Sequence, residues 1–193
     1  MRLFFLAALL LPALLPGAEK THQDKLLESA RSGNITSQVE LAAQYFSGTN
    51  RLVNPNLGAY WFRKAAEGGN AVARYNYAIC CLNGWGVKKS TQTAFLWLER
   101  AAGQQFVPAQ IKHAELLFNG VEAEESDDYR FPQIAANPDA ALKTLRKLAV
   151  SGDWIASGTL ARLLLSDTAN LEKNAAEIRA AAKFADSKNK GDT

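Results

Sequence analysis

Apolar residues recur along this chain at helical spacing, in segments that end regularly at a glycine followed by a polar residue. The stretch YWFRKAAEGGNAVARYNYA, from Tyr60 to Ala78, shows the pattern: one amphipathic helix ends at Gly68-Gly69, and Asn70 begins another without a loop. Glycine readily takes the left-handed conformation that closes a helix, and asparagine caps the next helix with its side-chain oxygen. The segment is therefore predicted to form two antiparallel helices joined by a tight turn.

This junction recurs along the chain. One alanine before each junction serves as an anchor, and successive anchors are separated by 36, 36, 47 and 36 residues: Ala30, Ala66, Ala102, Ala149 and Ala185. A period near 36 with one 11-residue insertion indicates an array of helical repeats. We expect nine helices and no sheet, with breaks near Gly33, Gly48, Gly69, Gly84, residues 103–105, Gly120, Gly152 and Asp167.

Each repeat is predicted to hold a helix A and a helix B with complementary side chains. Small residues share one stripe of helix A, and equivalent positions hold Ala42, Ala78, Ala114 and Ala161. Helix B carries large apolar residues near its end: Trp61, Phe62, Trp97, Leu98 and Leu145. One helix pair has no core of its own, so stacking of pairs must supply it. The pattern predicts an all-α solenoid of stacked antiparallel helix pairs, closed by a lone helix within residues 21–32 and a last helix at about 171–187.

Two motifs resemble the Sel1-like repeat, a relative of the tetratricopeptide repeat. AYWFRKAAEGGNA, at residues 59–71, matches the helix B part of the family pattern, and Gly84, Gly86 and Val87 match its GxGV turn. The resemblance covers Ser37 to about Asp186 in four units, although SGTNRLVNPN in the first unit lacks GxGV. It implies a right-handed α-solenoid whose A helices line the concave face, in a bacterial adaptor that holds proteins or peptides.

The first residues, MRLFFLAALLLPALLPGAEK, are typical of a secretory signal peptide, with one positive charge, a 13-residue apolar run and small residues after it. The run is shorter than the ~20 residues of a membrane span, although an uncleaved anchor is the alternative. We expect cleavage after Ala18, a periplasmic or secreted location and no membrane span afterwards. The chain would then comprise a signal peptide (1–18), a capping helix (19–34), a solenoid (35–187, with the insertion at about 120–137) and a polar tail (188–193).

Charge and chemistry narrow the function further. A net charge of +3 favours neither nucleic acid nor an anionic membrane as partner. The adjacent Cys80 and Cys81 are expected to be reduced, mostly buried side chains, with a redox switch or an intermolecular bridge as alternatives. His113 falls in a core position of helix A, where a partly buried, hydrogen-bonded imidazole is expected. No spacing in the sequence predicts a metal site, a cofactor or a catalytic constellation, so we expect a monomeric, non-enzymatic protein; a small secreted cell-wall enzyme and a structural spacer are the alternatives.

The predicted binding surface is the polar stripe of the A helices, on the concave face. Asparagine can hold an extended peptide backbone because its amide both donates and accepts hydrogen bonds, while a solvated helix face is the alternative. The insertion, GVEAEESDDYRFPQIAAN, is either a solvated acidic loop or a second contact surface anchored by Tyr129 and Phe131. The concave-face residues are Glu40, Ser47, Asn76, Asn83, Lys112, Glu115, Asn119, Thr159 and Arg162.

Overall fold

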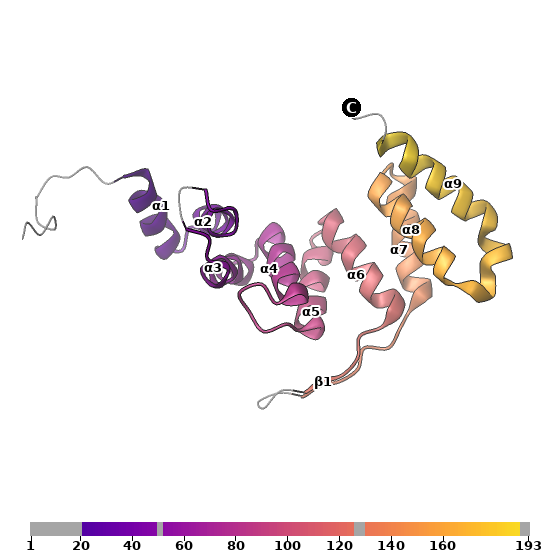
Figure 1. Ribbon diagram of the computed structural model, residues 1–193, viewed down its shortest axis with the longest axis horizontal. Helices are drawn as coiled ribbons and strands as arrows, with labels where there is room; N and C mark the ends of the chain where they lie inside the picture. Colours follow the sequence, from indigo (N-terminus) through magenta and orange to yellow (C-terminus); the bar gives the residue numbers. More distant parts are fainter. Residues whose placement is uncertain (1–20, 50–51, 126–129, 190–193) are drawn as a thin grey trace, which may run out of the picture.

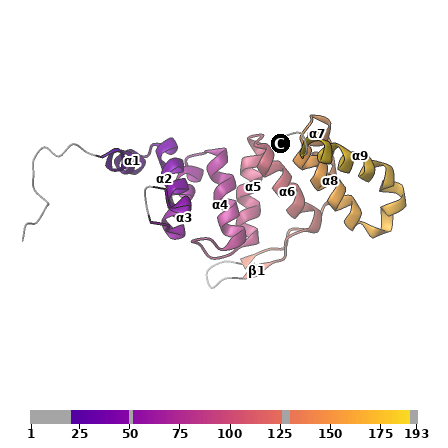
Figure 2. The same cartoon turned by 45° about the horizontal axis from the view of Figure 1, so that its top comes forward.

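The computed structural model describes residues 21–49, 52–125 and 130–189, and within them nine α-helices follow one another along a curved array (Figures 1 and 2). The predicted signal peptide, with its cleavage site, and the end of the polar tail lie outside the described residues. The helices are α1 (His22–Arg31), α2 (Ile35–Ser47), α3 (Pro55–Glu67), α4 (Ala71–Asn83), α5 (Thr91–Gly103), α6 (Val107–Asn119), α7 (Pro138–Val150), α8 (Trp154–Ser166) and α9 (Leu171–Asn189). A short 3₁₀ helix, η1 (Thr168–Asn170), precedes α9.

The tight junctions have the predicted conformation. Gly33, Gly69 and Gly152 have φ between 93° and 97°. The following residue then caps the next helix through its side-chain oxygen, as in Asn70, which accepts from the N–H of Ala73 at 2.8 Å. The third junction differs: Gln105 takes φ 62°, and no side chain caps α6. Pro108 lies in the first turn of α6, where a missing N–H costs no hydrogen bond, so the turn forms without glycine or asparagine.

Stacking supplies the core, as the repeat pattern predicts, and each helix packs chiefly on its neighbours in the chain. Leu98 and Leu145, equivalent residues of α5 and α7, are fully buried. The buried residues fall into two clusters that meet within α6, one from Leu26 to Ala109 and the other from Ile111 to Ala181. The array is therefore one continuous stack with two centres of burial. The A helices α2, α4, α6 and α8 form one surface of it, called the A-helix face below.

The expectation of no sheet is wrong in one place. The insertion after α6 contains a minimal antiparallel ribbon of β1 (Glu124–Glu125) and β2 (Arg130–Phe131). Its base is closed by an isolated bridge in which Val121 and Ile134 exchange backbone hydrogen bonds of 2.9 and 2.8 Å. In Figure 1 the ribbon projects from the lower edge of the array, beneath α5 and α6. Pairing satisfies backbone groups that a long irregular loop would leave to water.

Candidate functional site

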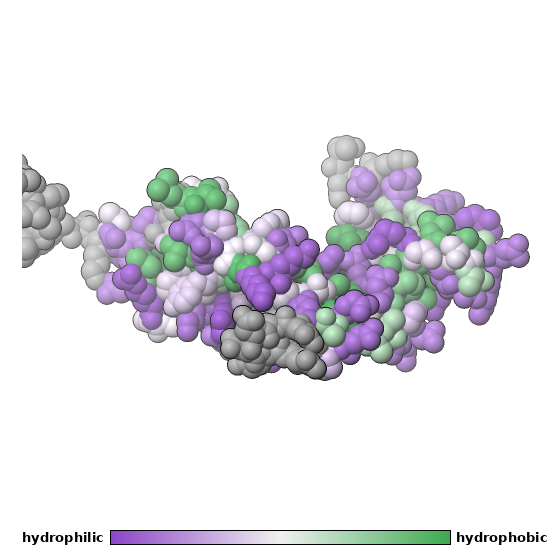
Figure 3. All heavy atoms as spheres, turned by 60° about the horizontal axis from the view of Figure 1, so that its bottom comes forward, coloured by the Kyte–Doolittle hydropathy of each residue, from purple (hydrophilic) through white to green (hydrophobic). Residues whose placement is uncertain are grey.

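Three pockets follow one another along the A-helix face. The first lies between α2 and α4, the second among α4, α6 and α8, and the third between α8 and α9. Exposed large apolar side chains occur near both ends of the array, and Figure 3 shows hydrophobic surface over its N-terminal and C-terminal parts, separated by polar surface. The face therefore offers several separate contact points rather than one deep cavity.

The first pocket, called the aromatic pocket below, has a volume of about 440 Å³. Such a volume is within the roughly 300–1,000 Å³ of small-ligand sites. Phe46 stacks on Phe62 with 5.7 Å between ring centroids, and Trp85 tilts against Phe46 at 6.4 Å. The lining also includes Ala43, Ser47, Asn76, Ile79 and Cys80.

Two glycines fix the rings of the aromatic pocket. A Cβ at Gly58 of α3 would lie 2.6 Å from the ring of Phe46, so Phe46 requires glycine at that position. A Cβ at Gly86, where φ is 71°, would lie 2.1 Å from the carbonyl oxygen of Pro55. The GxGV turn therefore lies directly on the start of α3 and holds Trp85 in place while its side chain remains 52% exposed.

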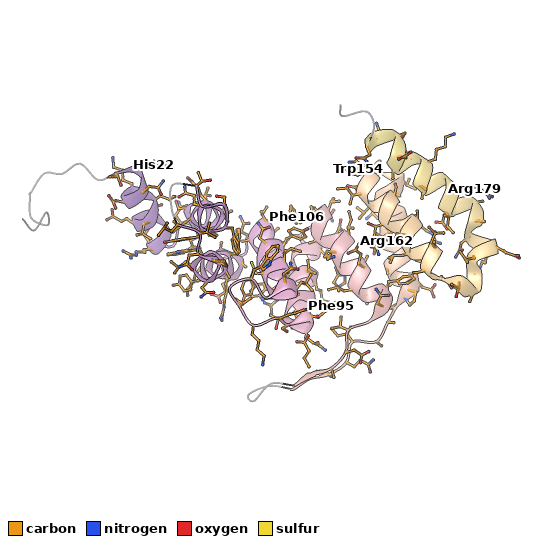
Figure 4. All side chains as sticks on the ribbon, viewed as in Figure 1. His22, Phe95, Phe106, Trp154, Arg162 and Arg179 are labelled. Carbon is orange, nitrogen blue, oxygen red and sulfur yellow. The ribbon has the colours of Figure 1, made fainter. Side chains whose placement is uncertain are left out.

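The second pocket, the central pocket, has a volume of about 300 Å³ and a charged rim. Lys112 pairs with Glu115 at 2.8 Å on α6, and the same carboxylate accepts from Arg162 of α8. Figure 4 shows Arg162 on the side of α8 that faces α6. The network connects two A helices at the edge of the pocket, which is lined by Tyr75, Val107, Pro108, Ile111, Lys112, Glu115, Asp153, Ile155 and Thr159.

The third pocket is an open groove of about 820 Å³ between α8 and α9. Trp154 and Ile155 begin α8 and are 40% and 50% exposed, and Leu165 at its other end is 53% exposed. Ala182 and Ala185 of α9 form the opposite wall. Arg179, in contrast, points away from the array on the outer side of α9 (Figure 4). The groove is thus a largely apolar continuation of the A-helix face.

The structure distributes the nine predicted face residues unevenly. None of these three pockets is lined by Glu40, Asn83 or Asn119. The two asparagine amides donate within their own helices, Asn83 to the carbonyl oxygen of Ile79 at 2.9 Å and Asn119 to that of Glu115 at 3.2 Å. Thr159 is only 8% exposed, although it belongs to the lining of two pockets. The predicted residues that do line the pockets are Ser47 and Asn76 in the aromatic pocket, Lys112, Glu115 and Thr159 in the central pocket, and Thr159 and Arg162 in the C-terminal groove.

Sequence reasoning missed the apolar members of the face. Phe46 and Trp85 do not belong to the polar stripe of the A helices, yet they form the wall of the aromatic pocket. One signal was present: Trp85 stands between Gly84 and Gly86, in a turn where a large apolar residue has no neighbour on either side to cover it. Gly58 was a second signal of the pocket, because the equivalent positions of the next two units hold alanine.

The insertion is bound to the array through Glu124. Its carboxylate accepts from the backbone N–H groups of Thr91 at 2.6 Å and Gln92 at 3.2 Å, and from the hydroxyl of Ser90 at 2.5 Å. A carboxylate at a helix N-terminus is stabilised by the helix dipole as well as by these hydrogen bonds. The acidic residue therefore acts as a second cap on α5, and its role is structural.

Gln92 holds both arms of the same insertion. Its side chain is 2% exposed, and Nε2 donates to the carbonyl oxygens of Glu122 at 2.7 Å and Pro132 at 2.8 Å. Of the two residues predicted to make contacts from this loop, Tyr129 lies outside the described residues and Phe131 lies in β2. The described part of the insertion is thus a docked ribbon and not a freely solvated loop.

His113 and the two cysteines occupy packed positions. Cys80 and Cys81 are both free and 2% exposed, and burial raises their pKa values to about 12 and 11. The His113 ring lies 4.5 Å from that of Phe95, and its buried Nε2 has no partner among the described residues, so the hydrogen bond expected there is not found at that atom. Burial lowers the pKa of His113, partly offset by Glu99.

The described residues contain no group of three or more histidine, cysteine, aspartate or glutamate side chains placed to bind a metal ion. None of their helices is both long and apolar enough to cross a membrane.

The repeat geometry agrees with a known family. The Sel1 repeat family matches residues 35–70 and 71–106, which hold α2 to α5 together with the GxGV turn. The chain carries two Sel1 repeats. They coincide with the first two units, the ones whose motifs match best, while α6 to α9 continue the same stack. No curated protein matches the chain.

Two solved structures are similar to this chain. One is a protective antigen of uropathogenic Escherichia coli strains with an SLR fold: TM-score 0.67, 22% identity, 84% of this chain and 32% of that one. The other is a Sel1 repeat protein from Oxalobacter formigenes: TM-score 0.58, 29% identity, 70% of this chain and 94% of that one. The chain spans about a third of the length of the antigen, whose likeness shows the fold alone.

Proposed function

We propose that this Sel1-repeat protein is an exported adaptor that holds a protein or peptide segment along its A-helix face. Sel1 repeats commonly form scaffolds for protein interaction. The observation that carries the proposal is the row of three pockets along the A-helix face, two between successive A helices and one between α8 and α9, which gives an extended chain several contact points on one surface. Helical repeats typically use such extended surfaces for binding.

The chemistry of the face suits a polypeptide. Apolar linings in the aromatic pocket and the C-terminal groove can receive side chains, and the Lys112–Glu115–Arg162 network between them can pair with polar groups of either sign. Binding surfaces on proteins concentrate their affinity in a few aromatic or arginine side chains within such a mixed setting. The A-helix face provides an aromatic side chain in Trp85 and an arginine in Arg162.

Site-specific photocrosslinking in the source cells tests this proposal. A benzoylphenylalanine at Lys112, on the A-helix face, should yield a discrete crosslinked protein. The same probe at Lys147 of α7, an exposed residue of a B helix, serves as the matched control and should yield none. Equal adducts from both positions, or adducts from Lys147 alone, would show that the A-helix face is not the binding surface.

Export is supported by the apolar leader at the N-terminus, which has the length and flanking residues of a signal peptide. Fractionation of the source cells and N-terminal sequencing of the protein test this part separately. The expected product begins at Glu19 and is found in the envelope or medium. A product that starts at Met1 in the cytosolic fraction would contradict export and leave the binding proposal standing.

A further inference from the structure

Among the described residues, no charged side chain lines the aromatic pocket. Three aromatic rings, the side chains of Ala43 and Ile79 and the protonated thiol of Cys80 surround it, and Ser47 and Asn76 add neutral polar groups. A lysine or a carboxylate entering this space would lose hydration and find no counter-charge, which is costly. The lining therefore selects for an uncharged apolar group.

The pocket depends on features that the neighbouring units do not share. Phe46 occupies its position because α3 has Gly58 where α5 and α7 have Ala94 and Ala141. Trp85 is held by a turn in which Gly86 touches the backbone of Pro55. A large aromatic ring kept half exposed by a constrained turn can bind a partner with little loss of side-chain entropy. The rings are thus preorganised for contact.

Asn76 supplies a hydrogen-bonding group at the same pocket. Its amide has no hydrogen-bond partner among the described residues, whereas Asn83 and Asn119 donate within their own helices. An amide donates and accepts at once, which matches the N–H and C=O of an extended peptide. Of the three asparagines predicted on this face, Asn76 alone combines a pocket position with an amide that no described residue engages.

The geometry points to the aromatic pocket as the anchor site for one bulky uncharged side chain, aromatic or branched aliphatic, of a peptide whose backbone pairs with Asn76. This inference rests on the proposed function and names the residue class that the A-helix face recognises. An uncharged lining excludes basic and acidic anchors, and the volume of about 440 Å³ leaves an alanine side chain with few contacts. The occupant is therefore distinguished by both charge and size.

A titration followed by ¹H–¹⁵N nuclear magnetic resonance tests the inference on the purified full chain. The probes are capped pentapeptides Gly-Ser-X-Ser-Gly in which X is Phe, Leu, Ala, Lys or Glu. The Phe and Leu peptides should shift the indole N–H of Trp85 and the side-chain amide of Asn76. Their Kd values should be lower by at least about tenfold than those of the Ala, Lys and Glu peptides, as is typical for loss of a central anchor.

Matched variants locate the binding. Trp85→Ala should weaken binding of the Phe peptide by at least about tenfold. Tyr60→Ala removes an exposed aromatic side chain of α3 that lines none of the three pockets, and it should leave this binding unchanged. Ala43→Glu is a second test that keeps all three rings, since Ala43 is exposed and its replacement only adds a charge to the pocket. Circular dichroism melting curves verify that each variant is folded.

Three results would overturn the inference: equal affinity for the Phe and Ala peptides, shifts confined to the central pocket, or self-association that Trp85→Ala abolishes, which would make a second copy the occupant. Failure here is separable from failure of the proposed function. If crosslinking from Lys112 persists in the Trp85→Ala variant at its full yield, the adaptor function holds and the anchor assignment is wrong. If Lys112 gives no adduct in the wild-type chain, the adaptor function itself fails.

Discussion

Replacing Gln92 should release the ribbon from the array, and the cost can be worked from its two hydrogen bonds. Gln92→Met keeps the approximate volume of the side chain and removes both donors. Each lost hydrogen bond is worth about 0.5–1.5 kcal/mol net, which gives about 1–3 kcal/mol for the pair at 2.7 and 2.8 Å. Glu122 and Pro132 are exposed residues, so water can reach their carbonyls once the ribbon moves, and the full penalty for burying an unpaired acceptor does not apply.

The assay has a global and a local readout. Urea unfolding followed by circular dichroism measures any loss in the free energy of unfolding. Amide hydrogen exchange at Val121 and Ile134, which pair at the base of the ribbon, should accelerate by about 5-fold to 150-fold, the equivalent of 1–3 kcal/mol. Gln92→Glu should be worse than Gln92→Met, because its carboxylate would face two carbonyl oxygens and lie near Glu124.

A control separates the buried amide from amides in general. Gln104 also makes two hydrogen bonds, but at an exposed site: its amide donates to the carbonyl oxygen of Gly69 at 3.0 Å and accepts from Arg74 at 3.0 Å. Gln104→Met should therefore change the free energy of unfolding by no more than about 0.5 kcal/mol. If Gln92→Met unfolds at the wild-type urea concentration and leaves exchange at Val121 and Ile134 unchanged, the two hydrogen bonds do not hold the insertion.

The remaining predictions concern pH, backbone space and thiols. Since burial lowers the pKa of His113 below 6.5, the unfolded chain takes up a proton before the folded chain does as pH falls, and the free energy of unfolding should decrease from about pH 6.5 downward through the folded-state pKa. In urea midpoints measured across pH 4.5–8, His113→Leu should remove this part of the decrease, whereas His22→Leu, at an exposed site, should not. Gly86→Ala should lower the free energy of unfolding by about 1–3 kcal/mol or more, because the new methyl group would collide with the backbone of Pro55 and the positive φ adds strain. An unchanged melting temperature would contradict the close contact described at this turn. Cys80 and Cys81 should react with a thiol reagent at pH 7 only as fast as the chain opens, since both thiols are buried and protonated, and stoichiometric labelling of the native protein within seconds would refute their burial.

Much of the fold was accessible from the sequence because the repeat makes each position testable against its equivalents. Gly69 and Asn70 indicate both the end of one helix and the start of the next through local backbone chemistry alone. The buried leucines at 98 and 145 follow from their shared place in the repeat. Such features depend on near neighbours in the chain, which a single sequence shows directly.

The ribbon and the aromatic pocket were not accessible in this way. Glu124 caps α5 from 33 residues farther along the chain, and its sequence neighbours are other acidic residues that give no sign of a distant partner. Phe46 and Trp85 meet only because α2 and the GxGV turn converge on α3. Periodicity predicts the polar stripe of the A helices. It does not reveal that the amides of Asn83 and Asn119 donate to carbonyls of their own helices, whereas that of Asn76 does not.

The docked ribbon stiffens one junction of the array. A stack whose units touch only their neighbours can bend at every junction. The ribbon follows α6 in the chain and is bound to the start of α5, so it spans the place where the two core clusters meet. The ribbon therefore opposes bending between α5 and α6. The GxGV turn after α4 is a shorter brace of the same kind, since Gly86 touches the backbone of Pro55 at the start of α3. A partner that lies along the A-helix face beside these two braces meets contacts whose spacing is held by segments outside the helices.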